Sequence, residues 1–417
     1  MAENKDKKVL NVPALRFPEF TEEWKRIKVS DLLDFYSTNS LSWEQLEYEP
    51  NEPYNLHYGL IHVGLSTLID LTKDKLPSIK DGNVPKKYEL CKEGDIAFAD
   101  ASEDTNEVAK VVEFYNLGDK KVVCGLHTIH GRNNNGQTAK GFLGYCFSST
   151  IFHNQIRRIA QGTKIYSIST KNFSEIFVGL PSRSEQQKIA TLLRLIDERI
   201  ATQNKIIEDL KKLKSAISKY LFARKDLLET TICLSNIATL KNGYAFQSGK
   251  YNALGKWKIL TITNVPGERY INDEDCNCII NLPNDIQDHQ VLKEGDILIS
   301  LTGNVGRVSL CKNGNYLLNQ RVGLLQLAKN VNQEFLYQIL SSQRFENSMI
   351  ACGQGAAQMN IGKGDVENYV LPYSSNGNNI LFAAKILHSY DECIINELRR
   401  LTLLTMQKQY LLTQMFI

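Results

Sequence analysis

Hydrophobic and polar positions follow the same order of patterns twice along this chain of 417 residues. In each copy, short apolar runs bounded by Gly and Asn come first, which predicts β-strands. Apolar residues at steps of three and four follow, and this spacing predicts an amphipathic helix over 140–160 and another over 333–352. The predicted strands lie at 29–35, 94–99, 108–114 and 122–130 in the first copy, and at 234–240, 257–265, 296–301, 307–311 and 316–327 in the second.

The spacing of the apolar residues changes after a Leu-Pro pair in each copy, Leu180-Pro181 and Leu371-Pro372. Two long segments follow whose apolar spacing predicts helices with a coiled-coil seam, interrupted at Gln203 in one and at Glu397 in the other. The predicted seam consists of Ile189, Leu193, Ile196, Ile200, Ile207, Leu210 and Ile217 in the first helix, and of Leu387, Ile394, Leu401, Leu404 and Leu411 in the second.

Each of these helices needs a partner for its apolar stripe, and the other copy offers an equivalent surface. About 40 residues at 1.5 Å per residue make a rod of about 60 Å. We therefore expect an antiparallel pair that holds two globular domains apart. The alternative is that each helix packs separately on its own domain.

Residue identities support the duplication. Residues 142–168 align without a gap with 335–361, and the motif KEGDI at 92–96 recurs at 293–297. A chain with two copies of one unit offers two similar binding surfaces, which suits a target with two parts.

Composition narrows the class of protein without naming a function. A hydrophobic content of 42%, a charged content of 23% and a net charge of +3 are those of an ordinary globular protein, and no apolar run reaches the roughly 18 residues of a membrane span. Nine scattered cysteines favour free thiols in a reducing cytosol, so we expect a cytoplasmic protein. No metal is expected, because neither the pair His57 and His62 nor the pair His127 and His130 has a third ligand at a recognisable spacing.

Catalytic signatures are missing from the sequence. There is no G-x-x-x-x-G-K-[ST] phosphate loop, no Asn-Pro-Pro-Tyr element of amino-methyltransferases and no H-E-x-x-H zinc motif. We therefore expect no catalytic residues and no cofactor in this chain.

The order of the patterns, together with SRSEQQKIATLLRLID at 182–197 and NVPALRFPEFTEEW at 11–24, resembles the specificity (S) subunit of type I restriction–modification enzymes. The resemblance covers 11–417 and implies an α/β (α+β) fold with two β-rich target recognition domains, separated by a long antiparallel two-helix coiled coil, in an internal pseudo-twofold repeat. The implied division is a flexible tail at 1–11, the first recognition domain at 12–182, the central helix at 183–225, the second domain at 226–373 and the C-terminal helix at 374–417.

The resemblance implies a noncatalytic protein that recognises a bipartite, asymmetric site in double-stranded DNA. Two modification subunits with S-adenosylmethionine would carry out methyl transfer, and restriction subunits with ATP and Mg²⁺ would complete the enzyme. The alternative is a coiled-coil scaffold that binds only proteins. One departure from the family is that the second helix lacks the EQQKI opening, so its first turn is expected to begin later or to be looser.

Base contacts specify sequence, so the two copies should differ where they touch bases. Three segments fit this expectation: the stretch after the shared GDI, the matched stretch near His127 and Arg321, and the loop after the helix. The predicted DNA contacts are Ser102, Asp104, His127, Thr128, Lys164 and Tyr166 in the first copy, and Asn304, Arg307, Gln320, Arg321, Gln358, Asn360 and Lys363 in the second. Solvated turns, capped turns or buried structural hydrogen bonds explain the same residues as well as DNA contact does.

Overall fold

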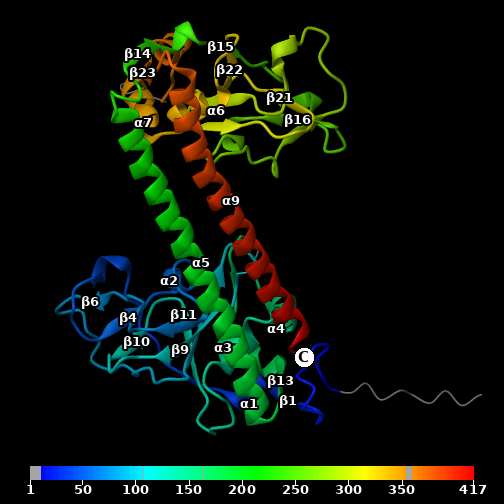
Figure 1. Cartoon of the computed structure of the whole chain (residues 1–417). Helices are drawn as coiled ribbons and strands as arrows, with labels where there is room; N and C mark the ends of the chain where they lie inside the picture. Colours follow the sequence, from blue (N-terminus) through cyan, green and yellow to red (C-terminus); the bar gives the residue numbers. More distant parts are fainter. Residues whose placement is uncertain (1–10, 106, 163, 354–358) are drawn as a thin grey trace, which may run out of the picture. The chain divides into compact units, whose positions relative to one another are not determined.

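The computed structural model describes residues 11–105, 107–162, 164–353 and 359–417. Most of the predicted tail and Gln358 therefore lie outside the described residues. The chain forms two compact units (Figure 1): unit 1 comprises Met1–Asn204 with Arg400–Ile417, and unit 2 comprises Lys205–Arg399. Each unit thus contains one β-rich domain, the beginning of one long helix and the end of the other.

Unit 1 is built around two sheets. A five-stranded sheet has the order β2 (Asp34–Tyr36), β11 (Thr128–Arg132), β7 (Ile96–Ala99), β9 (Val111–Asn116), β5 (Leu68–Asp70). A four-stranded sheet has the order β10 (Val122–Cys124), β4 (Tyr54–Leu56), β6 (Ser78–Ile79), β3 (Leu46–Glu47). Two short pairs join β1 (Lys25–Lys28) to β13 (Phe177–Leu180) and β8 (Ala101–Ser102) to β12 (Tyr166–Ser167). The helices of the domain are α1 (Val29–Leu32), α2 (Tyr58–His62), α3 (Phe142–Phe147) and α4 (Thr150–Ile159).

Unit 2 repeats this plan. One four-stranded sheet has the order β15 (Ala238–Asn242), β22 (Val322–Leu327), β19 (Ile297–Ser300), β20 (Val308–Leu310). The other has the order β17 (Asn277–Ile279), β16 (Trp257–Leu260), β21 (Tyr316–Leu318), β18 (Val291–Leu292), and β14 (Thr230–Cys233) pairs with β23 (Val370–Tyr373). The helices of the domain are α6 (Gln333–Leu340), α7 (Gln343–Cys352) and α8 (Lys363–Glu367).

The strand pairing carries the repeat that the sequence predicts. Strand β7 pairs antiparallel with β11 and β9, as β19 does with β22 and β20. The parallel pair of β10 and β4 recurs as β21 and β16. The predicted mixed fold with two β-rich domains is therefore confirmed.

The prediction of one amphipathic helix over 140–160 and one over 333–352 is wrong, because each segment forms two helices. In both copies the break falls at a Ser-Ser pair, where Ser149 and Ser342 are the N-caps of α4 and α7. Their hydroxyls accept hydrogen bonds from the backbone N–H groups of Phe152 and Phe345. A serine that caps in this way favours the start of a helix, so a new helix begins while the apolar period continues.

Two predicted strands also begin with a helical turn. Val29–Leu32 is helix α1, before strand β2, and Leu234–Asn236 is a 3-10 turn before β15. Val29 and Leu32 are both buried. A spacing of three residues places both side chains on one side of a helical turn, but it also occurs within a short apolar strand. The spacing alone therefore does not distinguish a helical turn from a strand here.

The two long helices are α5 (Arg183–Ala223) and α9 (Gly377–Gln414). In unit 1, Leu193 near the beginning of α5 and Leu411 near the end of α9 belong to one hydrophobic core. In unit 2, Leu221 near the end of α5 shares a core with Leu387 near the beginning of α9. The helix segments are therefore antiparallel within each unit, and every predicted seam residue is buried or half-buried.

Helix α9 begins at the position of the second copy that matches the first residue of α5. Gly377 follows Arg183 by 194 residues, which is the offset that also relates Leu387 to Leu193. The expectation that the second helix begins later is therefore wrong. Near the start of α9, the side chain of Asn379 donates to the Leu227 carbonyl at 3.0 Å, so a polar contact to the domain is present there without the EQQKI sequence.

Candidate nucleic-acid interface

The three segments predicted to touch DNA lie next to one another in unit 1. The backbone N–H of Asp100 donates to the carbonyl of His127 at 3.1 Å, and the carbonyl of Asp100 accepts from the N–H of Ile168 at 2.9 Å. Next to this junction, Ser102 in β8 pairs with Tyr166 in β12. Segments far apart in the sequence are thus joined at one place by backbone hydrogen bonds.

Unit 2 joins the matching segments in the same way. The N–H of Leu301 donates to the carbonyl of Arg321 at 3.0 Å, and its carbonyl accepts from the N–H of Ile361 at 2.9 Å. Thr302 also bridges to Asn360. Leu301 therefore stands where unit 1 has Asp100, Arg321 where it has His127, and Asn360 where it has Ser167.

In unit 2 these segments line an open groove of ≈ 700 Å³. Its charged lining residues, Arg321 and Lys363, are both cationic, and both are exposed. The lining consists of Asn242, Gly243, Leu301, Thr302, Gln320, Arg321, Asn360, Ile361, Gly362 and Lys363. Arginine suits the major-groove edge of guanine, and Asn or Gln suits that of adenine. Four of the predicted contacts thus meet in one groove with chemistry that suits DNA.

The counterpart in unit 1 has a different charge pattern. His127 is exposed, and its Nδ1 lies 3.1 Å from Oδ1 of Asp100. Asp104 and Lys164 are exposed, whereas Tyr166 is half-buried. A carboxylate can accept from the amino group of cytosine, so this surface presents other base partners than the groove of unit 2 does.

Aromatic residues that the sequence analysis missed flank the unit 1 surface. Tyr58 of α2 packs edge-on against His127, with ring centroids 5.2 Å apart. His57 accepts from the N–H of Gly59 at 3.1 Å, and burial, with a smaller contribution from the charge of His127, lowers the pKa of His57. A neutral ring suits this acceptor role. The sequence analysis did not choose these residues as DNA contacts, because the aligned repeat segments do not include the segment around α2.

Three predicted contacts are placed outside these surfaces. Thr128 is buried, and its hydroxyl donates to the carbonyl of Gly125 at 2.6 Å, which is the structural role that the sequence left open. Asn304 is exposed but does not line the groove. Arg307 also lies outside it, with its Nε 3.5 Å from Oε1 of Glu346. DNA contact by these residues stays a prediction.

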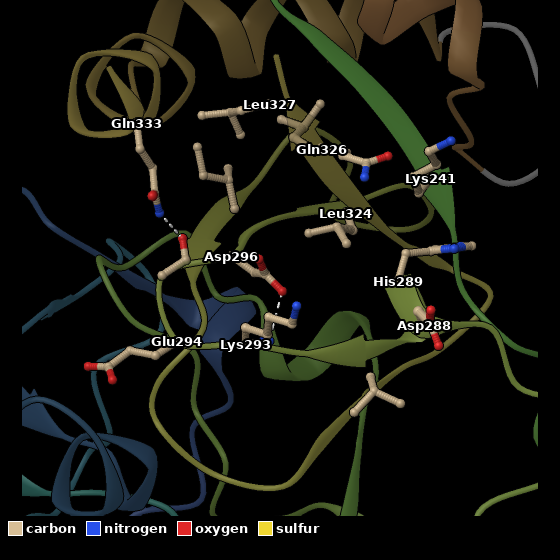
Figure 2. A pocket seen from close by; sticks show the side chains of 14 residues that line it. Lys241, Asp288, His289, Lys293, Glu294, Asp296, Leu324, Gln326, Leu327 and Gln333 are labelled. Carbon is tan, nitrogen blue, oxygen red and sulfur yellow. Dashed lines mark hydrogen bonds between the residues drawn. The ribbon is translucent and has the colours of Figure 1, made fainter. Parts of the chain in front are cut away.

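A second groove in unit 2, of ≈ 590 Å³, holds none of the predicted contacts. Figure 2 shows it between Lys241, Asp288 and His289 on one side and the side chain of Gln333 on the other. Its lining mixes acidic residues, among them Glu294 and Asp296, with lysines. DNA is a polyanion and binds best to surfaces that carry only positive charge. We therefore do not assign this groove, with its mixed charges, to DNA.

No helix in the described parts of the chain is both long enough and apolar enough to cross a membrane.

Comparison with known proteins places these features in context. A family model described as "Type I restriction modification DNA specificity domain" matches residues 113–212 and 229–405. The type I restriction enzyme MjaVIII specificity subunit of Methanocaldococcus jannaschii is 28% identical over 227 residues, an alignment that covers 49% of this chain and 52% of that protein. The type I restriction enzyme EcoKI specificity subunit of Escherichia coli (strain K12) is 24% identical over 281 residues, covering 61% of this chain and 60% of that protein. The chain thus spans only half to three-fifths of the length of these two relatives.

A solved structure supports the fold over nearly the whole length. The crystal structure of the type I restriction–modification system S subunit from M. genitalium matches with a TM-score of 0.57 at 18% sequence identity, covering 97% of this chain and 99% of that one. At this identity the likeness concerns the fold alone.

Proposed function

This chain belongs to the family of type I restriction modification DNA specificity domains, and on that premise we propose that it selects the DNA target of a type I restriction–modification enzyme. Each β-rich domain reads one half of a bipartite, asymmetric site, and the chain itself carries out no chemistry. The observation that carries this proposal is the meeting of the three predicted segments, through the same backbone hydrogen bonds, in both units.

The shared backbone and the differing side chains support an asymmetric site. Arg321 in unit 2 occupies the position of His127 in unit 1, and Asn360 occupies that of Ser167. Guanidinium and amide groups make bidentate contacts to purine edges, which an imidazole or a hydroxyl does not. One scaffold with two sets of side chains would recognise two different half-sites.

The groove of unit 2 also contains a group suited to positioning the duplex. Lys363 lies at the beginning of α8 with its ammonium 3.6 Å from Glu367, and more than half of its side chain is exposed. A lysine of this kind binds phosphate without regard to sequence. In the proposed complex, Lys363 positions the backbone while Gln320, Arg321 and Asn360 face the bases.

The other partners would bind through protein surfaces. Helix α9 carries Leu403, Met406 and Tyr410, whose side chains are 65%, 62% and 58% exposed. Their spacing of three and four residues makes one apolar stripe, the pattern that a helix buries against a partner. We assign this stripe to contact with one of two modification subunits. S-adenosylmethionine, ATP and Mg²⁺ are then expected on the modification and restriction subunits rather than on this chain.

The proposal is tested by assembling the chain with its modification subunits and mapping methylated sites by methylation-aware sequencing. Arg321→Ala should relax the sequence preference at one position of one half-site, corresponding to a loss of about 1–3 kcal/mol of discrimination. His127→Ala should change only the other half-site. Lys329→Ala, an exposed cation of unit 2 outside the groove, serves as the matched control.

A uniform loss of methylation with Arg321→Ala would mark a phosphate contact instead. Changes in both half-sites from a single substitution would contradict the assignment of one half-site to each domain. If the chain assembles with the modification subunits but neither Arg321→Ala nor His127→Ala changes the methylated sequence, the protein-only scaffold would be favoured.

A further inference from the structure

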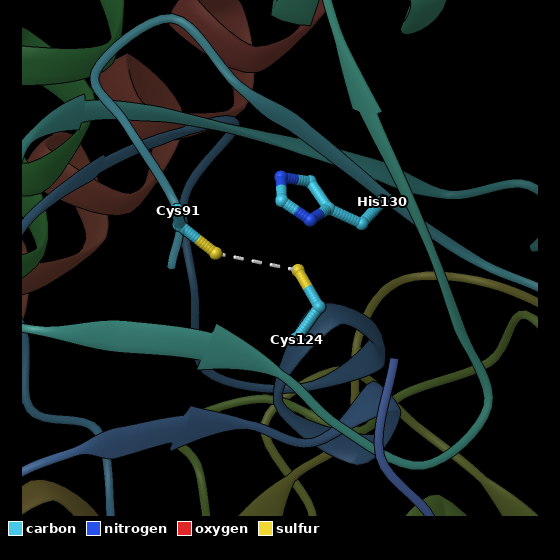
Figure 3. A group of neighbouring side chains, drawn as sticks. All are labelled: Cys91, Cys124 and His130. Carbon is cyan, nitrogen blue, oxygen red and sulfur yellow. Dashed lines mark hydrogen bonds between the residues drawn. The ribbon is translucent and has the colours of Figure 1, made fainter. Parts of the chain in front are cut away.

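Three side chains in unit 1 form a buried cluster that DNA recognition does not use. Cys91, Cys124 and His130 come from the segment before β7, the end of β10 and the middle of β11 (Figure 3). The two Sγ atoms are 3.6 Å apart, and the three possible ligand atoms all lie within 4.8 Å of one another. All three residues are buried.

The imidazole of His130 is oriented for a ligand. Its Nε2 lies 2.7 Å from Oδ2 of Asp95, so the proton on this side faces a carboxylate. Its Nδ1 is buried and has no hydrogen-bond partner within the described part of the chain. In Figure 3, Nδ1 is on the side of the ring that faces the two sulfur atoms. A buried ring nitrogen without a partner is costly and calls for an explanation.

From this geometry we propose that Cys91, Cys124 and His130 bind a transition-metal ion, with Zn²⁺ as the best match. Thiolate and imidazole are the ligands that zinc prefers, and a carboxylate on the far nitrogen is the usual support of a zinc-bound histidine. Two sulfurs about 2.3 Å from one ion at a tetrahedral angle lie about 3.8 Å apart, close to the separation found here.

The charges of such a site balance in the protein interior. Two thiolates neutralise a divalent cation, and the neutral imidazole adds no charge. Asp95, behind the ring, is itself paired with Arg132, whose Nε and Nη2 lie 2.8 Å from its two oxygens. Burial of charge is costly unless it is compensated, so this neutrality favours the ion.

The second copy shows that the fold does not require these polar groups. Matching strand pairs and backbone bonds place Leu292, Leu318 and Leu324 at the three positions in unit 2. These leucines are buried together in one hydrophobic cluster. Packing alone is satisfied by leucine there, so the thiols and imidazole of unit 1 indicate a role of their own.

The ion would fix the segment that carries His127. Cys124 and His130 flank this segment, and Cys91 lies in the segment before β7, where the bridge of Leu90 to Val123 joins that segment to β10. The metal would therefore hold in place the part of unit 1 that faces DNA in the proposed function. The binding of metal itself does not rest on that function.

The test uses the purified, reduced full-length chain and measures its zinc content after dialysis. We expect one zinc ion per chain, and Co²⁺ in its place should give a sulfur-to-cobalt charge-transfer band. Cys91→Ser and Cys124→Ser should each lose the ion and the band. The double variant Cys276→Ser/Cys278→Ser, which removes the close cysteine pair of unit 2, should retain both. The variant Cys91→Leu/Cys124→Leu/His130→Leu, which copies the second repeat, should fold without metal.

Failure of the reduced wild-type chain to bind Zn²⁺ or Co²⁺ would overturn the proposal, whatever the variants do. So would equal loss of metal in the control variant. A bond between Cys91 and Cys124, found by mass spectrometry of peptides from cells lysed under thiol-trapping conditions, would identify a disulfide instead. Hydrogen exchange tests the role in the fold: zinc removal should speed exchange in 125–129 but not in 319–323 of the same molecules.

Discussion

Lys408 of α9 and Asp197 of α5 form an ion pair in unit 1, with Nζ 2.6 Å from Oδ1. Unit 2 contains the matching pair, Lys214 with Asp391 at 2.5 Å, but there the lysine is on α5 and the aspartate on α9. The lysines are 194 residues apart, 408 less 214, and so are the aspartates, 391 less 197. Each unit thus uses one lysine–aspartate pair to join its helices, with the roles of the two helices exchanged.

Removal of Asp391 should destabilise unit 2 more than removal of Asp197 destabilises unit 1. Asp391 is buried and also accepts from Arg269 at 2.9 Å and from Gln338 at 2.6 Å. Asp391→Ala leaves the buried Arg269 with one carboxylate fewer, so we expect a loss of about 3 kcal/mol in the free energy of unfolding. Urea titration followed by circular dichroism measures this loss.

The more exposed Asp197, which accepts from the Tyr145 hydroxyl at 2.9 Å, should cost less on replacement by Ala. Glu208→Ala, which removes an exposed pair with Lys212 on α5, is the control and should change little. Equal losses in all three variants would show that these pairs do not stabilise the helix contacts.

Lys363→Ala should weaken DNA binding without changing the recognised sequence. If the ammonium neutralises one phosphate, its loss lowers the slope of log affinity against log salt by about 1. The measurement is a binding titration at several salt concentrations with specific and unrelated duplexes. A change in methylated sequence would instead assign Lys363 to a base.

The stability of unit 1 should fall as pH rises through the weakly acidic range because of Glu113. Burial raises the pKa of Glu113 to about 7, although the N–H groups of Gly144 and Gly141 at the start of α3 donate to its carboxylate and lower the pKa in part. A pKa raised in the folded state means that stability is fully present below the ordinary pKa and is lost as pH rises towards 7. The loss is roughly 3 kcal/mol for a shift of this size.

Glu113→Gln should remove this part of the pH dependence, measured as the difference in unfolding free energy between about pH 4.5 and 7. Glu44→Gln, at an exposed position, should leave the slope of the wild-type protein unchanged. A Glu113→Gln slope that matches the wild type would show that this carboxylate titrates normally.

Lengthening both long helices should lengthen the spacer between the half-sites. Insertion of four residues after Gln203 and after Glu397, which are matched positions, adds about 6 Å to each helix. At 34–36 Å per turn of about 10 base pairs, we expect roughly two more base pairs in the spacer. Methylation-aware sequencing gives the spacer length directly, and an unchanged length would contradict the expectation that the helix pair sets the distance between the two domains.

The repeat, the long helices and the general order of elements could be predicted because they leave periodic signals. Apolar spacing marks Ile189, Leu193 and Leu387, and all three are buried. The three segments predicted to touch DNA could be chosen because the copies agree around them and differ within them. Their meeting at one place follows from strand pairing, which acts over more than 60 residues between Asp100 and Ile168 and leaves no local pattern.

Other features depend on contacts that periodicity does not encode. The caps at Ser149 and Ser342 interrupt helices whose apolar spacing continues across the break. Cys91, Cys124 and His130 are too far apart in the sequence to form a recognisable metal motif, and only the fold assembles them. Glu113 illustrates a contact present in one copy alone, because the matching α6 is capped by its own Asn332.

The sharing of helix ends has a consequence for the order of events during translation. Unit 2 is one uninterrupted stretch, Lys205–Arg399, whereas the core of unit 1 includes Leu411, Met415 and Phe416. Residues that are synthesised after the whole of unit 2 therefore complete the core of unit 1, most of which is synthesised before it. Part of the apolar surface of unit 1 therefore stays uncovered until synthesis reaches the end of α9. Unit 2 can complete its core earlier.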